Sequence, residues 1–196
     1  RRQRQMCIRD RFIWELAVQQ LAKWQKEGRD ELYISVNIST KDFQYMDVYQ
    51  TITSLVERYG IIPSTLKLEI TETAIMMGNA GELETIGRFR NYGFEVEIDD
   101  FGSGYSSLNT LKDIDVDVLK IDMGFLRTTR SERLERSMSI LNMIISLSKI
   151  LGLSVVTEGV ETKEQVSRLS QMGCGVYQGY YFSKPIPVHE FEERYM

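Results

Sequence analysis

The stretch LETIGRFRNYGFEVEIDD, residues 83–100, decides the fold class. Its first half repeats apolar residues at the three- to four-residue spacing of an amphipathic helix. Gly93 follows, and glycine is the residue that most readily takes the left-handed conformation with which many helices end. The apolar run Phe94–Asp99 then predicts a strand with a polar end. One helix, one glycine and one strand therefore form the basic unit of the chain.

This unit recurs roughly every 30 residues, which favours an α/β fold with a parallel sheet. In such a fold all strand C-termini lie at one end. Six strands are fewer than the eight of a closed (β/α)8 barrel, which needs about 250 residues, so the sheet is either open or a truncated barrel. The predicted strands are Leu32–Ile38, Leu66–Thr71, Phe94–Asp99, Val116–Asp122, Ser154–Thr157 and Val176–Phe182.

The composition excludes several classes of protein. The 196 residues are 42% hydrophobic and 27% charged, which is ordinary for a globular domain. A net charge of -4 provides no global field that attracts a nucleic acid polymer. Two cysteines, Cys7 and Cys174, do not make a disulfide scaffold and predict a cytoplasmic protein. No run of about 18 apolar residues occurs, so we expect no membrane contact from this segment.

Residues 1–11 differ from the rest, because they hold five arginines against one aspartate. A basic arm of this kind is compatible with binding to nucleic acid or lipid headgroups. It is also compatible with the start of a signal peptide, although polar residues interrupt the apolar region after it. A third interpretation is that the segment is foreign to the protein. We interpret residues 1–11 as a disordered or artefactual tail and residues 12–196 as the domain.

Polar residues gather where the predicted strands end, and folds of this class place active sites there. Carboxylate and amide oxygens without histidine or thiolate suit Mg²⁺, Mn²⁺ or Ca²⁺ rather than zinc. Carboxylates that converge without a cation would repel one another, so we expect a metal site. The side chains expected to point into one cavity at these strand ends are Asn37, Glu69, Asp99, Lys120, Glu158 and Gln178.

Six motifs carry a resemblance to a known family: VNIS at 36–39, LEITE at 68–72, DDFGSGYSSL at 99–108, DVLKID at 117–122, EGVET at 158–162 and QGY at 178–180. In this order they resemble the successive motifs of the EAL-domain family, whose members hydrolyse the bacterial messenger cyclic di-GMP. The resemblance implies a TIM-like (β/α) barrel and a phosphodiesterase of signal transduction that releases linear pGpG. It also implies two divalent cations, Mg²⁺ or Mn²⁺, and a homodimer in the intact protein. A domain of this family is compatible with being the cytoplasmic part of a longer, membrane-anchored chain.

The resemblance assigns a role to each motif residue. Ligands of the first metal are Asn37, Glu69, Asp99 and Glu158; Asp99 bridges to a second ion, for which Asp100 is a further ligand. Lys120 orients or polarises the attacking water, while Glu161 and Gln178 hold water around the metals. Glu72 anchors the loop that begins with Phe101, Gly102, Ser103 and Gly104.

One departure concerns the Glu-Ala-Leu motif after which the family is named, because the sequence contains no such tripeptide. We therefore expect a barrel truncated at its N-terminus, which lacks its first strand. The resemblance implies that a metal-ligating glutamate and a substrate-contacting arginine are missing with it. Very slow turnover by this chain is the expected result. The strands on either side of the gap are expected to have unpaired edges.

Two other functions stay open. The first is a non-catalytic receptor or regulatory module that binds cyclic di-GMP, although the motif acids present here favour an enzyme. The second is a lysine-base enzyme of the enolase type, in which Lys120 abstracts a proton.

Alternation along the strands also predicts a buried ion pair. Lys67 shares a face with Glu69, and Glu97 shares a face with Asp99. If the two strands are neighbours, Lys67 and Glu97 both point inward, one layer below the metal. A buried charge is costly unless it is paired, so we expect contact between them.

Overall fold

The computed structural model describes residues 2–76, 78–102, 114–122, 124 and 131–196. The chain divides into two compact units, Arg1–Leu119 and Lys120–Met196. The division falls within strand β4 (Val118–Ile121). In the described ranges, no helix has the length and apolar character needed to cross a membrane.

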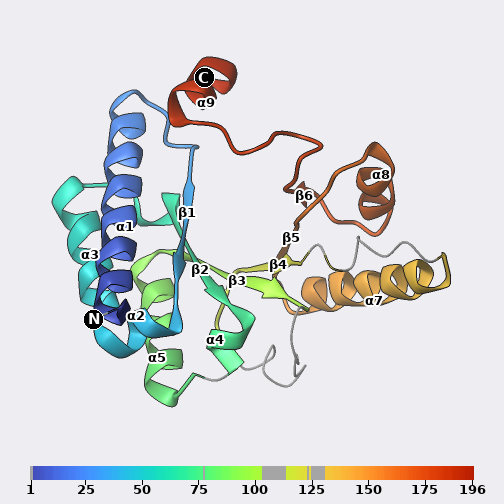
Figure 1. Ribbon diagram of the computed structural model, residues 1–196, viewed down its shortest axis with the longest axis horizontal. Helices are drawn as coiled ribbons and strands as arrows, with labels where there is room; N and C mark the ends of the chain where they lie inside the picture. Colours follow the sequence, from blue (N-terminus) through green and yellow to red (C-terminus); the bar gives the residue numbers. More distant parts are fainter. Residues whose placement is uncertain (1, 77, 103–113, 123, 125–130) are drawn as a thin grey trace. The chain divides into compact units, whose positions relative to one another are not determined.

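The first unit is built on three parallel strands in chain order. β1 (Ile34–Ile38) pairs with β2 (Leu66–Thr71), which pairs in turn with β3 (Glu95–Phe101). Helices α1, α3 and α5 lie on one side of these strands (Figure 1). The helical segments are α1 (Arg2–Lys26), α2 (Thr40–Tyr45), α3 (Val48–Tyr59), a 3-10 turn (Pro63–Thr65), α4 (Glu72–Met76) and α5 (Ala80–Tyr92).

Strand β2 explains how the sheet separates core from site. Leu66, Leu68 and Ile70 are fully buried in the apolar core. Successive side chains point to opposite faces of a strand, so the intervening residues face the other side of the sheet. Those residues are Lys67, Glu69 and Thr71. The polar face of the sheet thus lies opposite its apolar face, as the sequence predicted.

The glycine at the end of α5 performs the predicted task. Gly93 has a φ of 112°, and its N–H donates to the carbonyl oxygens of Phe89 and Arg90. A residue with a Cβ atom is strained in this conformation. The chain therefore leaves α5 and enters β3 at the point where the sequence places the change.

The start of α1 contradicts the sequence analysis. Residues 1–11 were expected to be a disordered or artefactual tail, but helix α1 begins at Arg2. Cys7, Asp10 and Trp14 are all buried, and their spacing of three and four residues defines one helical face. This face continues through the basic segment, so charge composition concealed the helical pattern. The origin of residues 1–11 stays a prediction.

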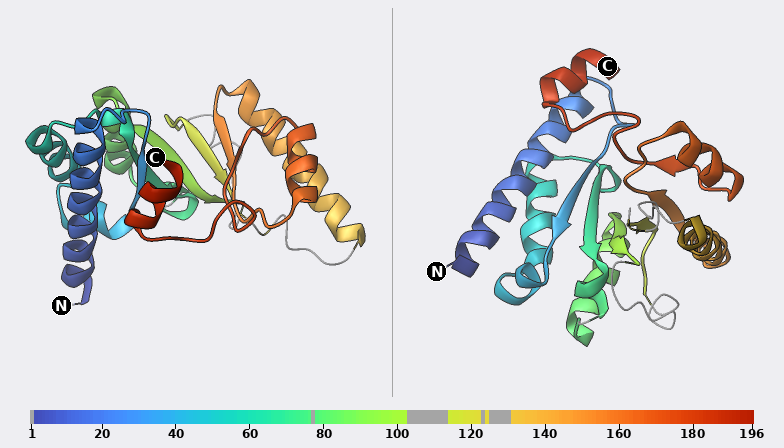
Figure 2. Two further views of the ribbon diagram at one scale, coloured as in Figure 1. Left: turned by 90° about the horizontal axis from the view of Figure 1, so that it is seen from above. Right: turned by 45° about the vertical axis from the view of Figure 1, so that its right-hand side comes forward.

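The second unit contains the remaining strands and helices. β5 (Ser154–Thr157) pairs in parallel with β6 (Val176–Tyr177). Helix α7 (Ser131–Ile150) packs against β5, as the two views in Figure 2 show. The other helices are α8 (Lys163–Gln171) and α9 (Val188–Tyr195).

Strand β6 is shorter than the predicted Val176–Phe182. The chain bends at Gly179, and the N–H of Tyr181 donates to the carbonyl of Val160 instead of extending the strand ladder. Helix α8 begins with a capping box, in which the Thr162 side chain accepts from the N–H of Gln165 and the Gln165 side chain accepts from the N–H of Thr162.

The strand order follows the chain from β1 to β6. Among the described residues, β1 and β6 are therefore the two strands with a single neighbour. The α/β class with parallel strands is confirmed, and so is the expectation of two sheet edges.

Candidate metal centre at the strand ends

The ends of β1 and β2 bring two of the predicted ligands into contact. Asn37 and Glu69 are partners in the parallel register. The Asn37 amide Nδ2 donates to Glu69 Oε2 over 3.1 Å. Glu69 is only 9% exposed, so this hydrogen bond orients a carboxylate that is largely removed from water.

The end of β3 supplies two further carboxylates. Asp99 lies in register with Thr71 of β2 and is half-buried, whereas Asp100 is exposed. Asp100 has a φ of 57°, a left-handed conformation that is rare for a residue with a side chain. Non-glycine residues held in this region cluster at functional sites. Backbone conformation therefore distinguishes Asp100 from the other acids of this unit.

Glu72 holds the chain just beyond β3. Its side chain is buried, and Glu72 Oε2 accepts the N–H of Gly102 over 2.9 Å. Phe101 is buried beside this contact. The contact agrees with the predicted anchoring role of Glu72, while Ser103 and Gly104 lie outside the described residues.

In the second unit, Lys120 of β4 forms a short ion pair with Glu158, the residue that follows β5. Lys120 Nζ lies 2.8 Å from Glu158 Oε1, and the side chains are 6% and 17% exposed. A buried ammonium group is stable only when it is paired and hydrogen-bonded. Glu158 therefore fixes the position of the Lys120 charge at the end of its strand.

Glu161 and Gln178 are placed differently from that pair. Both residues are exposed. The backbone of Gln178 is nonetheless well held, because its N–H donates to Thr157 and its carbonyl accepts from Val160. Their predicted roles at the metal site stay predictions.

The predicted pair below the metal ligands is confirmed, and it has an additional member. Lys67 Nζ lies 3.5 Å from Glu97 Oε1 and 2.8 Å from Glu95 Oε1. Burial acts to lower the pKa of Lys67, but the carboxylates of Glu95 and Glu97 outweigh it, and the pKa is raised. The sequence analysis missed Glu95. The register, in which Lys67 is paired with Glu95, explains this contact.

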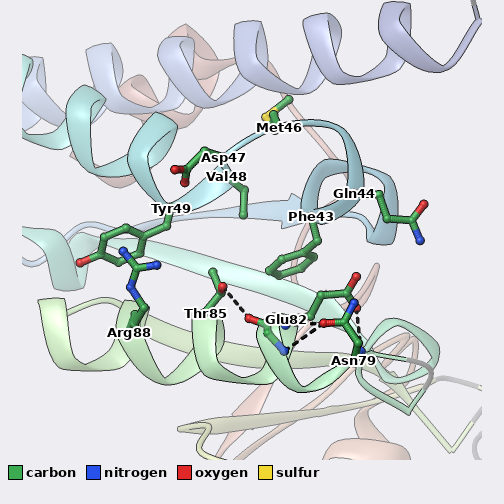
Figure 3. Close-up of a pocket in the computed structure, with 11 residues that line it drawn as sticks. Phe43, Gln44, Met46, Asp47, Val48, Tyr49, Asn79, Glu82, Thr85 and Arg88 are labelled. Atoms are coloured by element: carbon green, nitrogen blue, oxygen red, sulfur yellow. Dashed lines mark hydrogen bonds between the residues drawn. The ribbon is translucent and has the colours of Figure 1, made fainter.

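A cavity of about 390 Å³ lies elsewhere in the first unit, between the α2–α3 connection and α5 (Figure 3). Its polar groups serve the ends of the helices: Asp47 accepts the N–H of Gln50, and Asn79 accepts those of Gly81 and Glu82. The guanidinium group of Arg88 stacks on the Tyr49 ring, 3.8 Å from its centre. No predicted site residue lines this cavity.

The donor set at the strand ends fits a hard divalent cation. Glu69, Asp99 and Asp100 offer carboxylate oxygens, and Asn37 offers an amide oxygen. The hydrogen bond between Asn37 Nδ2 and Glu69 shows that these two predicted ligands share one side of the sheet. Oxygen ligands of this kind are those preferred by Mg²⁺ and Mn²⁺.

Comparisons with known proteins identify the family of the chain. The sequence model of the EAL domain matches residues 4–185. The cyclic di-GMP phosphodiesterase RocR of Pseudomonas aeruginosa is 33% identical over 184 residues, which are 93% of this chain and 46% of RocR. The chain thus spans about half the length of that relative.

Solved structures give the same result. The phosphodiesterase PaMucR of Pseudomonas aeruginosa, in its c-di-GMP complex, matches with a TM-score of 0.86 at 31% identity, over 92% of this chain and 72% of that one. The manganese and c-di-GMP complex of BlrP1 from Klebsiella pneumoniae matches with a TM-score of 0.74 at 25% identity, over 90% of this chain and 45% of that one.

Proposed function

The chain belongs to the EAL-domain family, and from this premise we propose that its strand ends form a site for metal-dependent hydrolysis of cyclic di-GMP to linear pGpG. The observation that carries the proposal is the contact between Asn37 and Glu69, next to strand β3, which contains Asp99 and Asp100 near its C-terminal end. The names of RocR and of the PaMucR complex support the choice of substrate.

Two divalent cations, Mg²⁺ or Mn²⁺, belong to this proposal. Asn37, Glu69, Asp99 and Glu158 would hold the first, and Asp99 and Asp100 the second. When bound, such ions lower the pKa of water and neutralise the charge of a phosphodiester. The BlrP1 complex with manganese supports this metal class.

The residues of the chain position the reactants around that site. Lys120 supplies a fixed positive charge beside the attacking water and stabilises the negative charge that develops on the phosphoryl oxygens. Its ion pair with Glu158 holds the ammonium group in place. Glu161 and Gln178 bind water around the metals, and Glu72 keeps the segment after β3 in position.

The reaction is a simple displacement at phosphorus. The oxygen of water forms the new bond to phosphorus, and the bond from phosphorus to one ribose O3′ breaks. The water gives up a proton, and the leaving O3′ takes one. The product is a linear dinucleotide that keeps a 5′-phosphate, which is pGpG.

We propose slow turnover for this chain, because no Glu-Ala-Leu tripeptide supplies the further carboxylate that the family resemblance implies. A second candidate function is binding of cyclic di-GMP without hydrolysis. Homodimer formation and a cytoplasmic location stay predictions.

The test is to incubate the purified chain with cyclic di-GMP and Mn²⁺ or Mg²⁺ and to follow pGpG by chromatography. We expect slow release of pGpG that EDTA and Asp99→Asn abolish. Glu164→Gln removes an exposed carboxylate on α8 and serves as the control that leaves the rate unchanged. Binding without pGpG supports the receptor function, and absence of both binding and hydrolysis contradicts the proposed substrate.

A further inference from the structure

A lysine lies directly below a proposed metal ligand. Lys67 and Glu69 are two residues apart on β2, so their side chains leave the same face of the strand about 6.6 Å apart. A lysine side chain is long enough to cover this distance. Nevertheless, within the described part of the chain the ion pairs of Lys67 are with Glu95 and Glu97.

Glu97 lies opposite Glu69 on the neighbouring strand, so both carboxylates are candidates to pair with the ammonium group of Lys67. The two glutamates are register partners on β2 and β3. Glu97 Oε1 is 3.5 Å from Lys67 Nζ, and Glu97 Oε2 accepts the hydroxyl of Ser35 over 3.2 Å. Ser35 and Lys67 are themselves register partners. They form the layer of inward-facing side chains that precedes the layer of Asn37 and Glu69, toward the start of the strands. Their contacts therefore draw the Glu97 carboxylate toward that lower layer.

The upper layer has a different partner for its carboxylate. Glu69 accepts the amide of Asn37, which is its own register partner on β1. The polar side of the first unit thus has two rows of contacts. The lower row contains the ammonium group of Lys67, and the upper row contains the proposed metal ligands Asn37 and Glu69.

We propose that Glu97 is a positioning residue for Glu69: it holds the Lys67 ammonium in the lower layer, so that the Glu69 carboxylate faces a divalent cation rather than Lys67. The inference rests on the metal site of the proposed function. It assigns a task to a buried acid that the hydrolytic mechanism does not use.

Burial gives this arrangement its strength. The side chains of Lys67 and Glu97 are 13% and 4% exposed, so water screens their charges poorly. With Glu97 neutralised, Lys67 keeps the carboxylate of Glu95, whose side chain is 32% exposed. Glu69 is then the more deeply buried carboxylate, two residues along the same face of β2. An ammonium group that pairs with Glu69 repels a metal cation. It also occupies the carboxylate oxygens that would bind that cation.

The test measures Mn²⁺ affinity by titration calorimetry without nucleotide, for the whole chain and three variants. Glu97→Gln keeps the shape of the side chain and removes its charge, and we expect about 10-fold weaker binding. Lys67→Met removes the competing cation and is expected to strengthen binding. The double variant has the net charge of the wild type and is expected to return close to its affinity.

The expected changes in Mn²⁺ affinity have opposite signs in Glu97→Gln and Lys67→Met, and this separates a positioning role from a structural one. Damage to packing weakens binding in both single variants, and that result overturns the proposal. Glu164→Gln serves as the charge-matched control, because it removes an exposed carboxylate in the other unit. Equal affinity of Glu97→Gln and the wild type also overturns it.

A crystal structure of Glu97→Gln provides a readout without metal or turnover. We expect Lys67 Nζ within ion-pair distance of Glu69, and a lysine that stays with Glu95 alone contradicts the proposal. If the wild type binds no Mn²⁺, the metal site of the proposed function fails, whereas the position of Lys67 in this variant still decides the inference.

Discussion

At the scale of single residues, Asp100 carries a conformational cost together with a chemical role. Its φ of 57° disfavours any residue with a Cβ atom, while its carboxylate is a proposed ligand of the second cation. A left-handed conformation costs an L-residue about 1–2 kcal/mol. The position thus favours glycine for stability and aspartate for metal binding.

Asp100→Gly and Asp100→Ala separate these two effects. Both variants lose the carboxylate, and we expect both to release pGpG more slowly than the wild type. Only glycine relieves the backbone strain, so its unfolding free energy should exceed that of the alanine variant by about 1 kcal/mol. Urea denaturation measures the difference, and equal stability of the two variants would contradict the argument.

The lower layer of β2 and β3 makes a second prediction at this scale. Lys67→Met removes the ammonium group that lies 3.5 Å from the buried carboxylate of Glu97. Breaking one side of a buried pair costs about 3 kcal/mol or more. The measurement is the urea unfolding of both proteins at neutral pH, and a loss below about 1 kcal/mol shows that the pair is too hydrated to matter.

The same pair has a defined pH dependence. The pKa of Lys67 is raised above its ordinary value of 10.5, so its charged form stabilises the folded state fully below that pH. As the pH rises through the raised pKa, this stabilisation is lost. The difference in stability between the wild type and Lys67→Met should therefore shrink above pH 10.5.

Residue patterns predicted part of this site and missed the rest for physical reasons. Alternation determines the face of a strand, so it was sufficient to predict contact between Lys67 and Glu97. It does not determine the register between strands, and Glu95 was missed because only the register pairs it with Lys67. The contact of Glu72 with Gly102 was expected from a family resemblance and not from local pattern.

At the scale of elements, helix ends were easier to predict than strand ends. The capping box of α8 requires only Thr162 and Gln165, three residues apart, so a local pattern is enough to indicate it. The end of β6 depends on a distant contact, between Tyr181 and Val160, which no local pattern contains. Residues 1–11 were predicted to be a tail because of their arginine content. The buried helical face that contains Cys7 and Asp10 was not recognised in the sequence.

The cap of α8 can be tested by substitution. Thr162→Ala removes the oxygen that accepts the N–H of Gln165, and we expect it to cost about 1 kcal/mol. Thr162→Ser keeps that oxygen and should change stability little. Thermal unfolding of the two variants checks the difference, and a serine variant as unstable as the alanine variant points to lost packing of the methyl group instead.

At the scale of the whole molecule, the proposed metal centre links folding to the cation. A ligand that binds only the folded chain raises its stability by about 2.7 kcal/mol at roughly 100 times its dissociation constant. We therefore expect Mn²⁺ to raise the melting temperature of the wild type in a concentration-dependent manner. Asp99→Asn should show a smaller rise, and an equal rise would place the cation outside the proposed centre.

The segment after β6 limits which sequences this domain tolerates. A Cβ atom on Gly179 would lie 2.2 Å from the carbonyl oxygen of Val160 and 2.3 Å from its nitrogen, and both are backbone atoms that no side-chain rotation can move. The restriction applies equally to small, large, polar and apolar replacements. In a saturation library selected for folded protein, position 179 should therefore return glycine alone, whereas the neighbouring exposed Tyr180 should return many residues.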